Sequence, residues 1–85
     1  MEYILSFRNT DSAIRAERCL LGHGVDVGVL PLPSQIKAGC GICLRVGDGA
    51  VDFALKALEG ENIRDVGLFS RIGEIGRYSY AREYS

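Results

Sequence analysis

The chain has 85 residues, with 10 Lys and Arg against 11 Asp and Glu, so its formal net charge is -1. A chain of this length holds one hydrophobic core and leaves no room for a second. A near-neutral balance without a block of Lys or Arg argues against a nucleic-acid binder or a polybasic membrane anchor, because both depend on concentrated positive charge.

The N-terminus lacks the features of an export signal or a membrane span. Its apolar run stops at Leu5, whereas a signal peptide has a basic start and an apolar core of about 7–15 residues. No segment of the chain reaches the roughly 18 apolar residues of a spanning helix. We therefore expect a cytoplasmic protein without a membrane partner, whose 3 cysteines are reduced thiols rather than a disulfide scaffold.

The first part of the chain predicts a strand, a helix and a second strand. Residues 3–7 are rich in β-forming side chains and are followed by a polar helix-capping segment and a helix over residues 12–21. One stripe of this helix carries Ala13, Ala16 and Leu20. Alternation then predicts a strand over residues 25–29, which Pro31 must end or confine to a sheet edge.

The second part repeats this order. Alternation predicts a third strand over residues 42–46, and a helix that Gly60 closes follows it. The helix has apolar residues at the spacing of one buried face, namely Val51, Ala54, Leu55 and Leu58. Residues 63–72 supply a fourth strand.

A short internal repeat indicates two similar halves. Residues 26–30, Asp-Val-Gly-Val-Leu, are echoed by residues 65–69, Asp-Val-Gly-Leu-Phe, and each copy follows a helix. The resulting βαββαβ order predicts an α+β, ferredoxin-like domain over residues 1–72, in which two helices cover one face of a four-stranded antiparallel sheet. Residues 73–85 form a C-terminal extension rich in Tyr and Arg, which we expect to extend the sheet or to dock on a partner.

Reactive side chains and a permissive backbone coincide only between Gly39 and Cys43. Glycines precede and follow Cys40, which leaves its sulfur clear of neighbouring side chains and lets backbone N–H groups approach it. We therefore expect Cys40, between Gly39 and Gly41, to be an exposed thiol at the mouth of a strand.

The predicted topology brings a helix N-terminus to this thiol. The third strand starts beside the end of the first, which places Cys40 near Arg8 and near the helix start at Thr10 and Ser12. Free N–H groups and the helix dipole favour an anion there, so a thiolate or persulfide would be stabilised. The carboxylate of Asp11 competes for the same donors.

The Cys-x-x-C spacing also permits a dithiol hypothesis. If residues 40–43 are extended, the two Cα atoms lie about 10 Å apart, beyond the roughly 7 Å limit of a disulfide. Alternation also places Cys43 on the face opposite Ile42 and Leu44. A turn at Gly41 would bring Cys40 and Cys43 together, so the disulfide stays an open alternative.

No metal site or ordinary enzyme site is predicted. A zinc site takes four ligands, and this chain offers 3 Cys and 1 His, with Cys19 in the first helix beside apolar residues and His23 at its end. We expect Cys19 to be a packing residue. The sequence contains no acid/base pair, no nucleophile with a histidine partner and no phosphate-binding loop, so we expect no stand-alone enzyme.

Several segments together resemble a known family. These are the strand 3–7 with its following helix, Pro31-Leu32-Pro33, and Gly39-Cys40-Gly41 leading into the strand 42–46. Over residues 2–70 the chain is similar to the selenium/sulfur carrier protein-like family, small proteins of anaerobic bacteria and archaea. The resemblance implies that Cys40 is the carrier cysteine. Cys43 is not one of the residues in the family's shared pattern, and the Tyr-rich tail lies beyond the resembling segment.

Three functional hypotheses follow. In the first, Cys40 accepts sulfur or selenium from a donor protein and passes it to an acceptor protein, with no cofactor beyond the transient cargo. In the second, the chain is a non-catalytic module that dimerises or docks through the open sheet face, lined by Ile4 and Leu30. In the third, Cys40 and Cys43 cycle as a redox dithiol.

Overall fold

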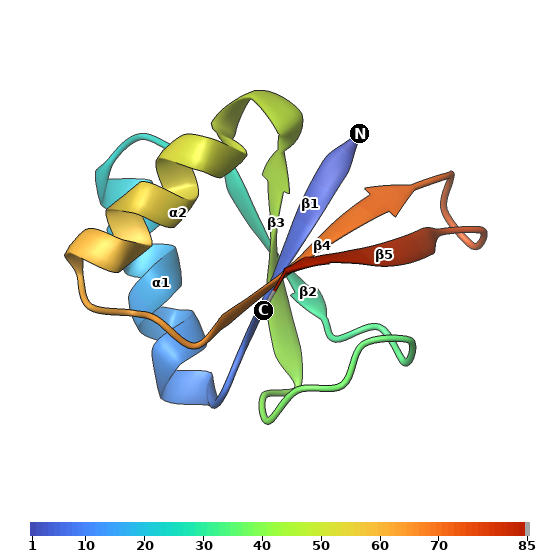
Figure 1. Cartoon of the computed structure of the whole chain (residues 1–85), viewed down its shortest axis with the longest axis horizontal. Helices are drawn as coiled ribbons and strands as arrows, with labels where there is room; N and C mark the ends of the chain where they lie inside the picture. The colour runs from blue at the N-terminus through green and yellow to red at the C-terminus, as the bar shows by residue number, and fades with distance from the viewer. Residues whose placement is uncertain (85) are drawn as a thin grey trace.

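Five strands form one antiparallel sheet, and two helices pack against it (Figure 1). In chain order the elements are β1 (Glu2–Phe7), α1 (Thr10–Gly22), β2 (Val27–Pro31), β3 (Ile42–Gly47), a 3-10 turn (Asp48–Ala50), α2 (Val51–Gly60), β4 (Val66–Ile72) and β5 (Ser79–Tyr84). The computed structural model describes residues 1–84, with Tyr84 described by its backbone alone. Across the sheet the strands follow the order β2-β3-β1-β4-β5, and every neighbouring pair is antiparallel.

The structure confirms the α+β class and both helices, but the prediction of four strands is wrong. Residues 79–84 of the tail form β5, which pairs along β4 and makes the sheet five-stranded. The segment Ser-Tyr-Ala-Arg-Glu-Tyr has two β-favouring tyrosines, but its other residues are small or charged, so its pairing depends on the edge that β4 offers. Ser85 lies outside the described residues.

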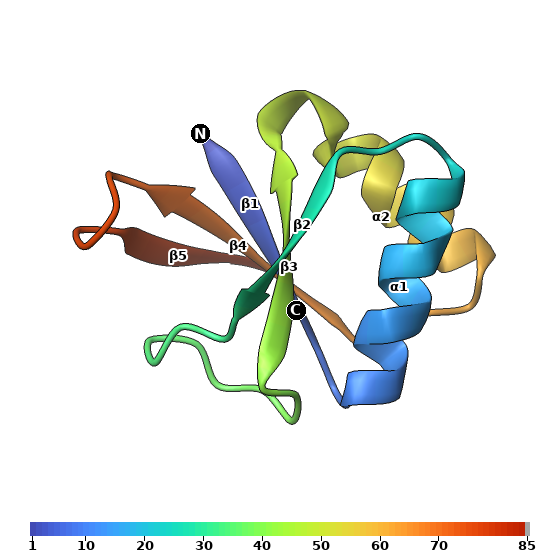
Figure 2. The same ribbon diagram turned by 180° about the vertical axis from the view of Figure 1, so that it is seen from behind.

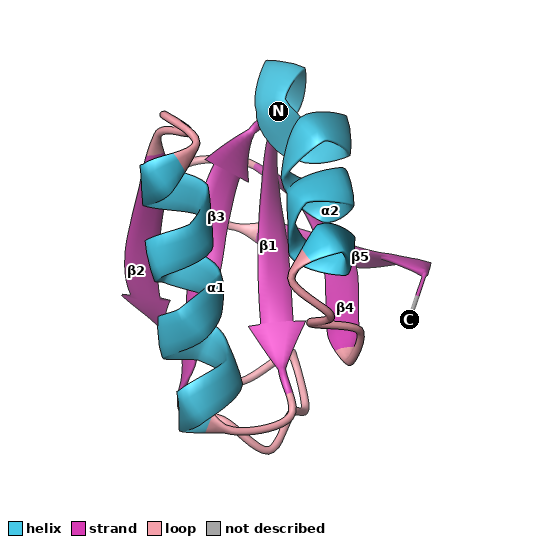
Figure 3. Ribbon diagram, turned by 90° about the vertical axis from the view of Figure 1, so that its left-hand side faces the viewer, coloured by secondary structure: helices cyan, strands magenta, loops and turns pink. Residues whose placement is uncertain are grey.

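Both helices cover the same face of the sheet, as Figure 3 shows from the helix side. Apolar residues of β1, β3 and β4 that point to this face form the main core with the buried stripes of α1 and α2. The largest of its fully buried side chains are Phe7, Leu5, Leu20, Leu44 and Leu58. Neither of the helices within residues 1–84 is long and apolar enough to span a bilayer.

α1 begins two residues before the predicted start because Asn9 caps it. The Asn9 side chain accepts a hydrogen bond from the backbone N–H of Ser12 at 2.8 Å, which satisfies one of the free donors of the first turn. The predicted apolar stripe is confirmed, with Ala13, Ala16 and Leu20 buried.

Pro31 lies at the end of an edge strand, a position that suits a residue without an N–H. β2 pairs only with β3 among the described strands, and Pro31 is its last residue, opposite Ile42. The strand runs two residues later than the predicted 25–29, because Val25 turns into the main core before the strand begins.

The other face of the sheet is less open than predicted. The loop between β2 and β3 folds back across one end of this face, as Figure 2 shows from behind. Its Ile36 is 3% exposed and packs on Ile4, Cys43 and Phe69. The predicted lining residues Ile4 and Leu30 do lie on this face, but they belong to this small second core and are not a free docking surface.

Beyond the second core, this face carries a charged cluster centred on Glu2. The Glu2 carboxylate accepts hydrogen bonds from Arg71 on β4 and from Arg45 on β3, the latter at 3.3 Å. The hydrogen bond from Arg71 is the largest cause that lowers the pKa of Glu2 below its ordinary value of 4.5, although burial acts against it. The guanidinium of Arg71 also lies over the Tyr78 ring, 4.0 Å from its centroid.

We expect Glu2→Gln to lower stability at neutral pH and to weaken the acid dependence of unfolding. A lowered folded pKa means that the Glu2 ion pairs stabilise the fold above about pH 4.5 and lose this effect as pH falls through the folded value. Urea unfolding at about pH 7 and about pH 3 measures the difference for both proteins. Asp65→Asn is the control, because the Asp65–Arg8 pair is exposed and contributes less than about 1 kcal/mol. An unchanged pH slope in Glu2→Gln would contradict this prediction.

Candidate functional site

Cys40 is buried, which corrects the expectation of an exposed thiol. Its side chain is 2% exposed and belongs to the main core on the helix side of the sheet. The cause is its neighbour Gly39, whose Cα lies so close to the backbone carbonyl oxygen of Arg8 that a Cβ there would collide with it. This contact holds the segment against the end of β1 and directs the next side chain inward.

The Cys40 sulfur has two polar neighbours. The backbone N–H of Ile42 donates to Sγ at 3.4 Å, and the thiol donates to the Thr10 hydroxyl at 3.7 Å. Thr10 is the first residue of α1, so the predicted proximity of Cys40 to this helix start is found in the structure. Both neighbours are groups that can donate a hydrogen bond to a sulfur anion.

The other two predicted supporting side chains do not contact the sulfur. Arg8 points to solvent and pairs with Asp65 at 3.3 Å. The backbone N–H of Ser12 donates a hydrogen bond to the side chain of Asn9. The bond between Asn9 and this donor was not predicted, although Asn9 lies in the predicted capping segment and belongs to the residue types favoured at N-caps. The pairing of Arg8 with Asp65 has no signal in the sequence.

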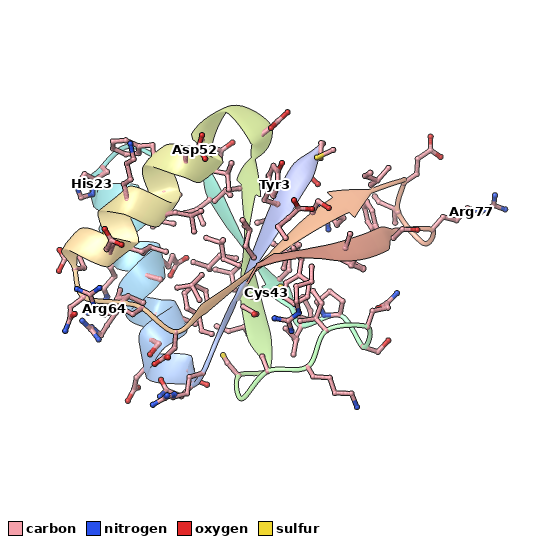
Figure 4. All side chains as sticks on the ribbon, in the orientation of Figure 1. Tyr3, His23, Cys43, Asp52, Arg64 and Arg77 are labelled. Carbon is pink, nitrogen blue, oxygen red and sulfur yellow. The ribbon has the colours of Figure 1, made fainter. Side chains whose placement is uncertain are left out.

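Cys43 lies on the opposite face of the sheet from Cys40. It is 0% exposed in the second core, and its thiol donates to the carbonyl oxygen of Pro31 at 3.7 Å. Figure 4 labels Cys43 where the strands cross, and its packing in the second core places its side chain on the face away from the helices. Burial is the main cause that raises the pKa of Cys43 to about 11. Its predicted position opposite Ile42 and Leu44 is confirmed by the two cores.

The arrangement of the two thiols gives no support to a Cys40–Cys43 disulfide. All three cysteines are free, and the β-strand itself separates the two sulfurs of the Cys-x-x-C segment. The backbone bends at residues 39–41, but β3 begins at the next residue, Ile42, and the two sulfurs lie in different cores.

Cys19 is the most accessible of the three thiols. It is half-buried on α1 and borders a shallow pocket of about 290 Å³ that is also lined by Arg15, Arg18, Glu61 and Ile63. The thiol donates to the carbonyl oxygen of Ala57 at 3.6 Å and lies 3.9 Å from Nδ1 of His23. Burial, followed by the charge of Glu61, raises the pKa of Cys19. Cys19 was predicted to be a packing residue, and its side chain does pack against the edge of the main core.

A larger groove runs between α2 and β4. It has a volume of about 650 Å³ and an apolar floor that includes Leu55, Leu58 and Val66, with charged residues at its rim. No cysteine lines it. Within residues 1–84, no group of three or more His, Cys, Asp or Glu side chains is placed to hold a metal ion.

We expect Gly39→Ala to destabilise the fold by about 1–3 kcal/mol, because its new Cβ meets the Arg8 carbonyl oxygen. The displaced segment is also expected to expose Cys40 to alkylation. Gly41→Ala is the matched control, because a Cβ at Gly41 has nothing within 4 Å. Urea unfolding and the rate of Cys40 alkylation measure both effects, and equal behaviour of the two variants would show that the Gly39 contact is not what buries the thiol.

The comparison with known families agrees with the sequence resemblance. Residues 2–70 of the 85-residue chain match the model of the family described as "Putative Se/S carrier protein-like". No curated protein and no solved structure shows significant similarity to the chain. The match ends within β4, so β5 lies beyond it. Because the match covers most of the chain, the protein belongs to this Se/S carrier protein-like family.

Proposed function

We propose that the protein is a sulfur or selenium carrier of the cytoplasm and that Cys40 is its carrier cysteine. The observation that carries the proposal is the pair of donors around the Cys40 sulfur, the Ile42 amide and the Thr10 hydroxyl. Family membership supports the same chemistry. We also propose that β1 to β4 and the two helices retain the ferredoxin-like arrangement, to which β5 is an addition.

The other two thiols are less suited to this role. A carrier cysteine reacts as the thiolate, and burial raises the pKa of both Cys19 and Cys43, the latter to about 11. The Cys43 thiol donates a hydrogen bond to a carbonyl oxygen, which favours the neutral thiol. Around Cys40, by contrast, one neighbour is a donor already and the Thr10 hydroxyl can rotate to become a second.

The proposed step is a transfer between two sulfur atoms. The Cys40 thiolate attacks the outer sulfur of a donor persulfide, R–S–SH, and forms Cys40–S–SH while the S–S bond of the donor breaks and R–S⁻ leaves. The transferred sulfur keeps its oxidation state, so no external oxidant or reductant is needed. A partner thiolate then attacks the outer sulfur of the Cys40 persulfide in the same way.

Transfer requires the segment before β3 to open, because Cys40 is buried. The segment between β2 and β3 contains no helix or strand, and it is held by the Gly39–Arg8 contact, the buried Ile36 side chain and a hydrogen bond from the Leu32 N–H to the Gly41 carbonyl oxygen at 2.9 Å. A strand inside the sheet is held by many more contacts than this segment. The free energy of opening the segment is therefore lower than the free energy of unfolding the whole protein. We propose that the donor or acceptor protein binds this open form.

Intact-mass spectrometry after incubation with glutathione persulfide tests the proposal. Both proteins compared carry Cys19→Ser, because the more accessible Cys19 can also take up sulfur. We expect Cys19→Ser to gain one sulfur atom, and the double variant Cys19→Ser with Cys40→Ser to gain none. Peptide mapping locates the added atom. The same measurement on protein isolated under anaerobic conditions shows the cargo acquired in the cell. If the double variant gains sulfur as Cys19→Ser does, or if Cys40 carries none under either condition, the assignment is lost.

A further inference from the structure

β5 gives the sheet a free edge that lies outside the family match. The strand is paired on one side with β4 and has no second neighbour among residues 1–84. Its pairing with β4 is regular from Ser79 to Arg82, and the register shifts beyond Arg82. The backbone groups on its outer side are therefore available in a regular row, which is the surface that another strand can pair with.

The two edges of the sheet differ in how they are protected. The opposite edge strand, β2, ends at Pro31, which has no N–H, and the chain then turns into the loop that Leu32 ties to Gly41. β5 contains no proline. Its exposed residues Ala81, Arg82 and Glu83 are small or of opposite charge, so this edge does not repel a second copy of itself.

We propose that the protein forms a homodimer by antiparallel pairing of β5 with the β5 strand of a second copy, centred on Ala81. In this register Ala81 lies opposite the partner's Ala81, and Tyr80 lies opposite the partner's Arg82. By symmetry the Tyr80–Arg82 pair occurs twice. The two sheets become one continuous sheet across the two-fold axis.

The chemistry of the exposed sheet face favours this register. Tyr80 and Arg82 pair with Arg71 and Phe69 of β4, on the face away from the helices. The Arg82 guanidinium already lies 4.9 Å from the centroid of the Phe69 ring, and the partner's Tyr80 adds a second aromatic ring beside it. Aromatic and cationic residues placed opposite each other stabilise strand pairs. The two alanines at the axis are small, so the two β5 strands can approach to the distance of a paired strand.

Neighbouring registers are less favourable. A pairing centred on Arg82 places Arg82 opposite the partner's Arg82, and like charges directly opposite are destabilising. A pairing centred on Tyr80 places the partner's Arg82 opposite Tyr78, which lies before β5 and whose ring is already covered by Arg71. The short edge predicts weak association, with a dissociation constant on the order of 100 µM.

Disulfide trapping in the full chain tests the register. In a Cys19→Ser background, we expect Ala81→Cys to form a disulfide-linked dimer under mild oxidation, because the two residues face each other across the axis within the range of a disulfide. Ser79→Cys is the matched control: the two copies of residue 79 would lie about 13 Å apart along the strands and should not link. Equal linking of the two variants, or none by Ala81→Cys, overturns the proposal.

Sedimentation equilibrium tests the association without a covalent bond. We expect a dimer at about 0.5 mM protein and a dissociation constant raised about fivefold or more by Ala81→Lys, because two lysines then face each other at the axis. Ala81→Ser, which adds no charge, should leave the constant within about twofold. A monomer at every concentration, or equal effects of the two substitutions, also overturns the proposal.

Discussion

Native-state alkylation is expected to modify Cys19 first, Cys40 next and Cys43 last. Cys19 borders a pocket, whereas the other two thiols react only when their surroundings open. Each 1.4 kcal/mol of opening free energy slows the reaction about tenfold. We expect Cys43 to be slower than Cys19 by about a hundredfold or more, because it lies within a central strand and its pKa of about 11 leaves little thiolate.

Time-resolved labelling with iodoacetamide, followed by peptide mapping, measures the three rates. Cys40 should fall between the other two, because a short irregular segment covers it and not a strand. In denaturant all three thiols should react at similar rates, which is the control for intrinsic reactivity. If Cys43 were labelled before Cys40 in the native protein, the opening of the second core would cost less free energy than the opening of the segment around Gly39. That result would contradict this prediction.

Phe7→Ala is expected to have the largest effect of any single substitution on stability. Phe7 is 1% exposed at the end of β1 and belongs to the main core together with Cys40. Truncating a buried Phe to Ala costs about 3–5 kcal/mol, which is a large part of the roughly 5–15 kcal/mol that a domain has. We therefore expect a markedly lower urea midpoint and faster alkylation of Cys40.

Phe53→Ala is the matched control for this prediction. Phe53 is 50% exposed on α2, where its ring makes an edge contact with His23 at 5.7 Å between centroids. Its truncation leaves no internal cavity, so we expect a loss of less than about 1 kcal/mol. Equal losses from the two substitutions would contradict the division between core and surface described above.

Much of the fold follows from local patterns. The spacing of Val51, Ala54 and Leu58 predicts α2, and all three residues are buried. The first four strands lie within a few residues of their predicted ranges, the first from its β-forming residues and the second and third from alternation, and Pro31 predicts an edge. The tail after residue 72 was expected to extend the sheet or to dock on a partner, and it extends the sheet. The bounds of β5 were not predicted, because its formation depends on pairing with β4 and not on an apolar pattern of its own.

The candidate site was predicted in part. The topology brings Cys40 to Thr10, as the sequence implied, and alternation places Cys43 on the other face. The burial of Cys40 could not be read from its flanking glycines. Gly39 is needed for a close approach to Arg8, a residue 31 positions away in the sequence, and such contacts carry no local signal.

The separation of Cys40 and Cys43 by the sheet has a consequence for retention of cargo. In a dithiol pair, a second thiolate attacks the inner sulfur of a persulfide, expels hydrosulfide and leaves a disulfide behind. Here the backbone of β3 stands between the two sulfurs, and Cys43 is also held as a neutral thiol. If Cys40 carries sulfur as proposed, this arrangement would protect the bound sulfur atom from discharge within its own molecule, and its release would require the thiol of an acceptor protein.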